Sequence, residues 1–533
     1  MKNMVDTKER LNKIRDSIVV PKQDKIIKMY KIHKYWARKP WYYVNSYIKE
    51  FTNKGDVVFD PFSGSGVTGV ESLVLDRNSI LIDLNPVSTF VSRMTILNHN
   101  ITEEIEIEFE KISVKLKNKL NKLYILSKKC EFCGSNYLGE YFERGPKFKS
   151  ISAKAYCPNC GKRKTMKKLL LSEKDLQNLH KLEKSKIANW YPQNKFPEKF
   201  DKDRITYKGI TSVDKLFTNR NLHALSTLLS VIQDIKDNNV KELLLLSFSD
   251  TLLHASKLKG ANVRPLSVNN YWVPDDWIEE NVWFRFAQRV ENLLEGKKIA
   301  NERIKNSDYS CEIFNQSSTD VSNIIKNDSI DFIFTDPPYG DSIQYDELSM
   351  VWNFWFKNEY KHDDEIIINR SKKKNIKNYE DLLSQVFSET FRVLKNEKFL
   401  MVTFHNKDFK VWSAIIRAIK GAGFSFCGLN IHDPLGNSFN KNWSKRSPKT
   451  DLYMLFKKSI KMNNSQLSLG FNLSEIDGII DKYKAHGSTL NITNIYDEVL
   501  EKAIDYVFKT DDYESLKNIS IYLIDRIMNL NDK

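Results

Sequence analysis

The sequence has little cysteine, no long apolar run and fewer acidic than basic residues. Six cysteines in 533 residues are too few for a disulfide scaffold. No apolar run approaches the roughly 18 residues of a membrane-spanning helix, and Leu243 to Leu246 is among the longest. The opening residues MKNMVDTKER lack the apolar core of a secretory signal. We therefore expect a cytoplasmic protein with no membrane partner.

The shortage of acids leaves a net charge of +15, from 83 lysines and arginines against 68 aspartates and glutamates. Such a surplus favours a polyanionic partner, although charge alone does not decide for nucleic acid. Hydrophobic residues make up 41% of the chain and aromatic residues 12%, which excludes disorder of the whole chain. The length predicts two to four domains.

Short apolar strands that end in acids define the expected fold. Residues 56–59 lead to Asp60, a glycine turn and a helical pattern, and residues 79–82 lead to Asp83. The same pattern returns at residues 330–334, followed by a helix near 380–394 and strands at 399–404 and 452–456. Strands that alternate with helices predict an α/β fold with a doubly wound, Rossmann-like sheet.

About 220 residues without this alternation separate the two halves of the predicted sheet, too many for a loop in a compact domain. We expect the cofactor motifs in residues 1–100 and a zinc-ribbon insertion in 101–168. A helical insertion that would hold target recognition follows in 169–305. The second half of the catalytic domain is expected in 306–460, and a helical C-terminal region in 461–533.

A glycine-rich turn marks the expected cofactor site. Residues 64–69 (GSGVTG) match G-x-G-x-x-G, and Asp83 follows Gly64 by nineteen residues, where an acid can accept hydrogen bonds from ribose hydroxyls. A dinucleotide or S-adenosylmethionine would satisfy this pattern. Asp60 favours S-adenosylmethionine, because a carboxylate can pair with its ammonium group. The alternative is a tight turn between strand and helix that binds nothing.

Asp336-Pro337-Pro338-Tyr339 directly follows the apolar strand at residues 330–334. A carboxylate and a proline carbonyl can accept both hydrogens of a planar exocyclic amine, which favours the pyramidal nitrogen that attacks a methyl sulfonium. Tyr339 would stack on a base rotated out of its duplex and offset part of the unstacking cost. The alternative is a simple proline turn.

Together, residues 60–66 (DPFSGSG) and 335–339 (TDPPY) resemble the DNA amino-methyltransferases, which form N6-methyladenine or N4-methylcytosine. The resemblance implies that the first motif and the second acid bind S-adenosylmethionine and that the D-P-P-Y residues are catalytic. An aromatic and basic cluster at residues 33–42 occupies the place of the remaining cofactor motif of that family, unless it only braces the first strand. The implied cofactor-binding residues are Lys39, Pro40, Trp41, Asp60, Pro61, Phe62, Gly64, Gly66 and Asp83, and the implied catalytic residues are Asp336, Pro337, Pro338 and Tyr339.

An aspartate at position 336 resembles the adenine branch of this family, with the cytosine-N4 branch as the alternative. The resemblance implies double-stranded DNA as substrate and a setting in restriction-modification or phage defence, where a cognate restriction endonuclease would be the partner. The sequence indicates no oligomeric state. RNA methyltransferases of the tRNA guanine-N2 type share a similar D-P-P-Y-G. From other classes, an inactive nucleic-acid-binding scaffold or a dinucleotide oxidoreductase stays open.

Four cysteines form two Cys-x-x-Cys pairs, Cys130 with Cys133 and Cys157 with Cys160, each followed by glycine. This spacing is typical of a zinc ribbon, in which four thiolates close a tetrahedron around a structural zinc ion. Redox-active or unligated cysteines are the alternatives. Three basic segments, 162–168, 370–377 and 440–449, add to the charge, and the last two follow late strands where we expect phosphate contacts.

Overall fold

The computed structural model describes residues 2–21, 24–97, 101–146, 151–198, 205–267, 270–305, 308–358, 362–406, 408–432 and 451–459, with 477–479, 481–482, 499, 502–508 and 510 of the C-terminal region. The basic segment 440–449 and most of the predicted helical tail lie outside these residues. None of the described helices is long and apolar enough to cross a membrane.

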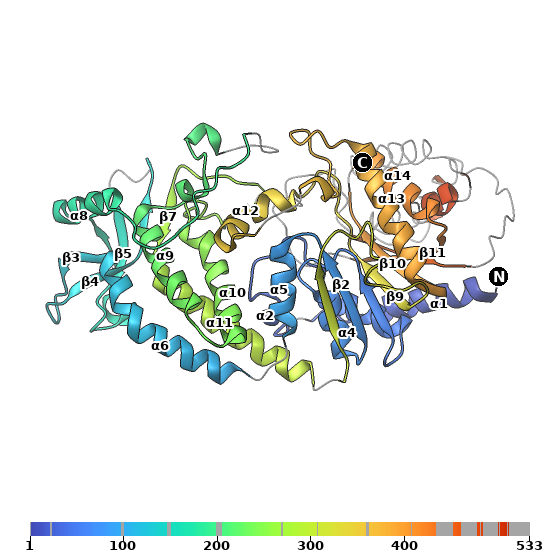
Figure 1. Ribbon diagram of the computed structural model, residues 1–533, viewed down its shortest axis with the longest axis horizontal. Helices are drawn as coiled ribbons and strands as arrows, with labels where there is room; N and C mark the ends of the chain where they lie inside the picture. Colours follow the sequence, from blue (N-terminus) through green and yellow to red (C-terminus); the bar gives the residue numbers. More distant parts are fainter. Residues whose placement is uncertain are drawn as a thin grey trace.

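A seven-stranded sheet forms one end of the molecule (Figure 1). Its strand order is β11-β12-β10-β9-β1-β2-β8, and the five strands from β10 to β8 pair in parallel, whereas β12 is antiparallel to both of its neighbours. The strands are β1 (Val57–Asp60), β2 (Asn78–Asp83), β8 (Cys311–Asn315), β9 (Ile330–Thr335), β10 (Leu394–Phe404), β11 (Ser425–His432) and β12 (Asp451–Lys457). The α/β class and all five predicted strands are confirmed; β8 and β11 were not predicted.

Alternating side chains of these strands bury both faces of the sheet, as the two-residue period of a strand requires. On one face, Phe332 and Phe334 pack with helices α1 (Lys2–Ser17), α3 (Trp41–Phe51) and α4 (Val67–Val74). On the other face, Ile333 packs with α13 (Ile376–Val393) and α14 (Phe409–Gly421). Helices therefore cover both faces of the sheet.

The long insertion lies between two strands that are neighbours in the sheet, because β2 pairs in parallel with β8. Its helices are α6 (Thr102–Asn121), α7 (Lys162–Thr165), α8 (Glu173–Lys184), α9 (Asn219–Gln233), α10 (Asn238–Ala255) and α11 (Val282–Arg303). The remaining helices are α2 (Ile27–Tyr30), α5 (Pro86–Ile96) and α12 (Tyr345–Phe356), with 3-10 turns η1 (Lys122–Tyr124), η2 (Thr206–Lys208), η3 (Val213–Leu216) and η4 (His362–Asp364). Lys297 of α11 is buried and donates to the carbonyls of Met94 and Thr95 at the end of α5, which fixes the insertion against the first half of the sheet.

A second sheet holds the cysteine pairs at the far end of the molecule (Figure 1). It consists of β3 (Ile125–Lys129), β4 (Asn136–Arg144), β5 (Ser152–Tyr156), β6 (Lys167–Leu170) and β7 (Trp277–Glu280). Strand β7 comes from the segment predicted to be helical and pairs with β4. The cysteine-bearing sheet is thus joined to the helical region by a strand that the sequence pattern did not reveal.

Candidate functional site

The turn between β1 and α4 has the backbone that its glycines permit. Gly64 has φ +52° and Gly66 has φ +77°, in the left-handed region that favours glycine. A Cβ atom on Gly64 would lie 3.0 Å from the ring of Tyr35, and one on Gly66 would lie 2.8 Å from the Cβ of Ser92. The turn is therefore packed too closely for larger residues at either position.

Asp83, at the end of β2, holds this turn in place. Its carboxylate accepts the backbone N–H of Gly64 at 2.8 Å and that of Asn85 at 2.9 Å. Burial raises the pKa of Asp83 to about 6, against the lowering effect of these hydrogen bonds. The carboxylate also accepts a hydrogen bond from the side chain of Ser88, and because it has about four lone-pair positions it can still accept a ligand hydroxyl.

Asp60, at the end of β1, joins three segments of the chain. Its carboxylate accepts the backbone N–H of Phe62 at 3.0 Å and the hydroxyls of Thr68 at 2.7 Å and Thr335 at 3.1 Å. Burial raises the pKa of Asp60 to about 7, although these three hydrogen bonds lower it. A cation in the adjacent cavity would favour its ionised form.

The carboxylate of Asp336 follows β9 and keeps one oxygen open. Its Oδ1 accepts the hydroxyls of Thr403, at 2.8 Å, and of Tyr339. Its Oδ2 accepts no hydrogen bond from any residue that the structure describes. Burial raises the pKa of Asp336, and the nearby charge of Lys39 opposes that rise.

Of the three backbone carbonyls that follow Asp336, two accept hydrogen bonds and one is open. The carbonyl of Pro338 accepts the hydroxyl of Tyr379 at 2.6 Å, and that of Tyr339 accepts the side-chain amide of Asn406 at 3.0 Å. The carbonyl of Pro337 receives no hydrogen bond within the described ranges. The D-P-P-Y segment therefore presents two open acceptors, Asp336 Oδ2 and the Pro337 carbonyl.

Lys39 links this segment to the last strand of the sheet. Its ammonium group lies 3.4 Å from Asp336 Oδ1 and 3.0 Å from Asp451 Oδ2, and it donates to the hydroxyl of Tyr339 at 2.6 Å. Burial alone would lower the pKa of Lys39, but Asp336 and Asp451 raise it, so the amine stays charged. No motif pointed to Asp451.

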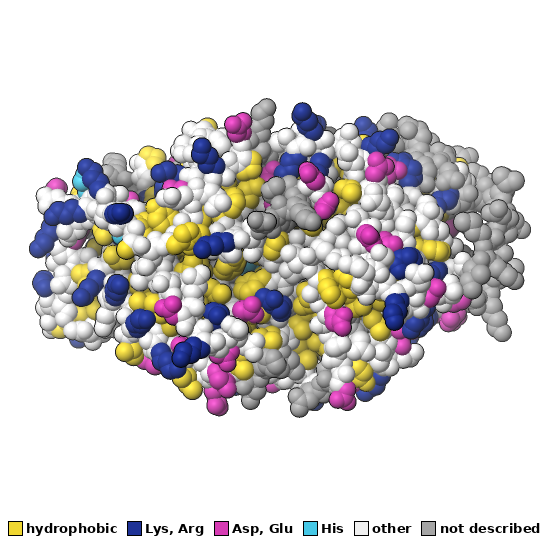
Figure 2. Space-filling model, viewed as in Figure 1, with side chains coloured by type: hydrophobic (Ala, Val, Ile, Leu, Met, Phe, Trp, Pro, Cys, Tyr) yellow, Lys and Arg dark blue, Asp and Glu magenta, His cyan; other side chains and the backbone are white. Residues whose placement is uncertain are grey.

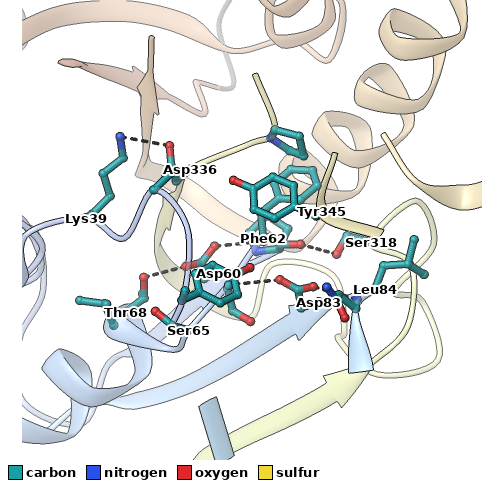
Figure 3. A pocket seen from close by; sticks show the side chains of 18 of the residues that line it. Lys39, Asp60, Phe62, Ser65, Thr68, Asp83, Leu84, Ser318, Asp336 and Tyr345 are labelled. Atoms are coloured by element: carbon teal, nitrogen blue, oxygen red, sulfur yellow. Dashed lines mark hydrogen bonds and ion pairs between the residues drawn. The ribbon is translucent and has the colours of Figure 1, made fainter. Parts of the chain in front are cut away.

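An open cavity of about 950 Å³, solvent at its mouth included, brings the three acids together. In Figure 3, Lys39 and Asp336 lie on one side of it and Asp83, Leu84 and Ser318 on the other, with Asp60, Phe62 and Tyr345 between them. The predicted residues that line the cavity are Lys39, Asp60, Pro61, Phe62, Gly64, Asp83, Asp336 and Pro338. Pro40, Trp41, Gly66, Pro337 and Tyr339 are not among the lining residues. Tyr35, Trp36 and Arg38 also line the cavity and belong to the aromatic and basic cluster at residues 33–42, and Ser65 belongs to the glycine turn. Lining residues that no motif indicated include Ser317, Ser318, Tyr345 and residues 364–366.

Two buried polar atoms of the lining have no hydrogen-bond partner among the described residues, the hydroxyl of Ser63 and the indole N–H of Trp36. Buried polar groups are rarely left unpaired. A polar ligand in the cavity would satisfy both, so the residues present fit a polar cofactor.

Trp41 lies elsewhere, at the start of α3. Its indole N–H donates to the carboxylate of Asp24 at 3.0 Å, and the guanidinium carbon of Arg303 lies 4.6 Å from the centre of its ring. Pro40 precedes this helix in an extended conformation. Pro40 and Trp41 thus form the start of the helix that directly follows Lys39 in the chain.

Comparison with known proteins matches this site to one family. A family model described as DNA methylase matches residues 5–89 and 330–519, just over half of the chain. The chain belongs to the DNA methylase family. The matched segments contain the glycine turn, both strand-end acids and the D-P-P-Y residues, of which Asp336 and Pro338 line the cavity.

Three relatives carry type II methyltransferase names. M.MjaII of Methanocaldococcus jannaschii is 26% identical over 340 residues, which cover 59% of this chain and 60% of the relative. M.BsoBI of Geobacillus stearothermophilus is 37% identical over 89 residues (15% of this chain, 17% of the relative), and M2.MboI of Moraxella bovis is 36% identical over 77 (14% and 28%). The chain thus spans about three fifths of M.MjaII and less than a third of the other two.

The cysteine pairs lie outside the segments matched to the DNA methylase family. Their four sulfur atoms all lie within 4.8 Å of one another, with Cys130 and Cys160 at 3.9 Å and Cys133 and Cys157 at 3.4 Å. Four thiolates at about 2.3 Å from one zinc ion would stand about 3.8 Å apart. The donor set and its spacing therefore fit tetrahedral zinc.

The basic segment 370–377 is partly used within the protein. Lys372 pairs with the buried carboxylates of Asp346 at 2.6 Å and Glu365 at 3.1 Å. Lys374 donates to the backbone carbonyls of residues 363 and 365. These two lysines hold their own loop beside the cavity, which leaves Arg370, Lys373 and Lys377 as its exposed cations.

Proposed function

We propose that the protein is an S-adenosylmethionine-dependent DNA methyltransferase that methylates the exocyclic N6 of an adenine rotated out of its duplex. The observation that carries this proposal is the pair of open acceptors, Asp336 Oδ2 and the Pro337 carbonyl. Asp336 lines the same cavity as Asp60 and Asp83. An exocyclic amine has two hydrogens, and two open acceptors on consecutive residues suit it.

The cavity offers partners for each part of the cofactor. Asp83 would accept the ribose hydroxyls, and Asp60 would pair with the ammonium group. The buried guanidinium of Arg38, held by the hydroxyl of Ser65 at 2.9 Å, is the cation available to the cofactor carboxylate. Phe62, Pro61, Gly64 and Gly66 shape the wall and the turn, and Pro40 and Trp41 begin the helix behind Lys39. When bound, S-adenosylmethionine supplies an electrophilic methyl sulfonium.

The residues of the chain would orient the amine and take up its proton. Hydrogen bonds to Asp336 and Pro337 draw the nitrogen toward a pyramidal shape, with its lone pair free to attack. The nitrogen gains the methyl group and loses a proton, and the carboxylate of Asp336 is the nearest acceptor. Burial raises the pKa of Asp336, which makes it a better base than an exposed aspartate. Lys39 holds the hydroxyl of Tyr339, whose ring would stack on the base.

The parallel strands β1, β2, β9 and β10, with helices on both faces, support one Rossmann-like domain built from residues 1–100 and 306–460. We infer that residues 101–168 and 169–305 are inserted domains, the second for target recognition. We also infer that residues 461–533 form a helical C-terminal region, of which Ile504 and Val507 pack against the seven-stranded sheet. We also infer that the four cysteines hold a structural zinc ion, because four thiolates leave no open coordination position.

The aspartate at position 336 supports adenine over cytosine. The type II names of the relatives support a setting in restriction-modification, with double-stranded DNA as substrate and a cognate endonuclease as partner. The test supplies the purified protein with labelled S-adenosylmethionine and DNA or RNA from a methylation-free host, then identifies modified nucleosides by mass spectrometry. We expect N6-methyladenine from DNA, and none with Asp336→Ala. N4-methylcytosine would overturn the base assignment, and methylation of RNA alone would overturn the DNA substrate.

A further inference from the structure

The positive charge of the chain is concentrated in the cysteine-bearing sheet. Residues 122–170 contain twelve lysines and arginines against three glutamates, a surplus of nine where the whole chain has fifteen. This segment makes up less than a tenth of the sequence. The excess charge is therefore local and lies outside the segments matched to the DNA methylase family.

The acids of this segment are already neutralised. Glu140 pairs with Lys162 at 2.9 Å, Glu131 pairs with Lys167 at 2.5 Å, and Glu143 pairs with Lys168. Six exposed cations form no ion pair with an acid in the part of the chain that the structure describes: Lys122, Lys128, Lys129, Lys154, Arg163 and Lys164. Their charge is thus available to an external anion.

Four of these cations lie around the cysteines. Lys128 and Lys129 directly precede Cys130, and Arg163 and Lys164 follow Cys160 after two residues. Because the sulfurs of Cys130 and Cys160 lie 3.9 Å apart, the two chain segments that carry these cations lie close to each other. The ammonium of Lys164 lies 4.1 Å from the ring centre of Phe132, which is 58% exposed. We call Lys128, Lys129, Phe132, Arg163 and Lys164 the knuckle surface.

Buried ion pairs connect the sheet that carries the knuckle surface to the helices of the insertion. The buried carboxylate of Glu279 on β7 pairs with Arg220 of α9 at 2.6 Å and with Arg144 of β4 at 2.8 Å. Figure 1 shows helices α9 to α11 between the cysteine-bearing sheet and the seven-stranded sheet. Figure 2 shows lysine and arginine side chains gathered at that end of the molecule. The sheet that carries these cations is therefore anchored to the helical insertion, at the end of the molecule away from the seven-stranded sheet.

We propose that the knuckle surface binds the phosphate backbone of duplex DNA outside the target site. An array of exposed cations suits duplex DNA, whose phosphates are densely and regularly spaced. The contact contributes affinity and orientation without reading bases. The four cysteines gather the cations, so occupancy by metal would organise this surface. The inference rests on the proposed function, since it requires DNA as substrate.

The experiment compares Lys128→Gln/Arg163→Gln/Lys164→Gln with a matched control, Lys25→Gln/Lys31→Gln/Lys49→Gln. The control removes three exposed cations that form no ion pair in the described structure and lie on or next to α2 and α3. Affinity for a labelled long duplex of random sequence is measured between about 50 and 200 mM salt. The slope of log affinity against log salt is negative, and each lost phosphate contact makes it less negative by about 0.9.

We expect the slope of the knuckle variant to be less negative than that of the wild type by up to about 2.7, and the slope of the control variant to be unchanged. A duplex that covers only the methylated motif should bind both variants equally, and the rate at saturating DNA should stay at the wild-type value. Each single substitution should make the slope less negative by about 0.9. The single variants therefore test the inference even if the triple variant misfolds.

A wild-type protein that methylates DNA, with the same slope in wild type and knuckle variant, would overturn this inference alone. A wild-type protein that neither binds nor methylates DNA would overturn the proposed function. An equal change of the slope in the knuckle and control variants would show that net charge causes the effect, and would contradict a phosphate contact at the knuckle surface. A knuckle variant that loses affinity for structured RNA but keeps its affinity for duplex DNA would also contradict the inference.

Discussion

The ammonium group of Lys39 lies 3.4 Å from the carboxylate of Asp336. Because burial raises the pKa of Asp336 and Lys39 opposes this rise, Lys39 keeps more of the carboxylate ionised at neutral pH. Lys39→Met should raise the pKa of Asp336 further and move the acid limb of the pH–rate profile to higher pH. A shift of one unit would cost about tenfold in rate below that limb. Lys39→Arg, which keeps the charge, should retain most of the wild-type profile. Identical profiles for wild type and Lys39→Met would contradict this role.

Cofactor affinity should depend on the ionisation of Asp60. Burial raises the pKa of Asp60 to about 7, so the free protein loses this negative charge as the pH falls below that value. A cationic ammonium group binds the ionised form better, and affinity for S-adenosylmethionine should therefore fall as the pH drops from 8 to 6. Titration calorimetry at several pH values between 8 and 6 measures this affinity. Asp60→Asn should bind more weakly at high pH and lose the dependence; an unaltered pH dependence in that variant would rule out Asp60 as its source.

The ion pair between Glu279 and Arg220 should support the fold of the insertion. Burial alone would raise the pKa of Glu279, but Arg220 and Arg144 lower it to about 2. Glu279→Gln leaves buried arginine charge uncompensated and should lower the free energy of unfolding by about 3–5 kcal/mol. Denaturant unfolding measures this.

The control for Glu279 is Glu131→Gln, which breaks the exposed pair with Lys167. Surface pairs of this kind contribute about 0–1 kcal/mol, so this variant should unfold almost as the wild type does. Equal effects of the two substitutions would show that the buried pair does not hold the insertion together.

The cysteine cluster should bind one zinc ion per chain. Cys157→Ser removes a buried ligand and should lower the zinc content, measured by atomic emission, and destabilise the cysteine-bearing sheet. Cys427→Ser, far from the cluster in sequence, should keep full zinc content. A wild-type protein without bound metal after purification in zinc-containing buffer would refute the site.

The predicted strands share one property, a short apolar run that ends in or near an acid or turn. Their side chains are buried on both faces, so the signal is strong, as in Phe332, Ile333 and Phe334. Strand β8 was missed because it lies at the edge of the sheet and its residues are only partly buried or exposed. Strand β7 is four residues long and adds to β4, more than 130 residues earlier in the chain, which no local pattern reveals.

In the candidate site, too, some residues have a local sequence signal and others depend on contacts between distant parts of the chain. Asp60, Asp83 and Asp336 are recognisable because each follows a strand and two of them flank a glycine turn. Asp451 pairs with Lys39 across 412 residues, and Tyr345 and Ser318 reach the cavity from segments without a motif. Such contacts depend on the order of strands in the sheet, which the sequence pattern does not specify.

The most direct test expresses the wild-type protein and Asp336→Ala in a host that lacks DNA methylation. Native genomic DNA is then sequenced by a method that distinguishes N6-methyladenine, N4-methylcytosine and unmodified bases. We predict N6-methyladenine at one sequence motif with the wild type and at none with Asp336→Ala. Unmodified DNA from cells that contain the folded wild-type protein, or equal methylation by both proteins, would contradict the account.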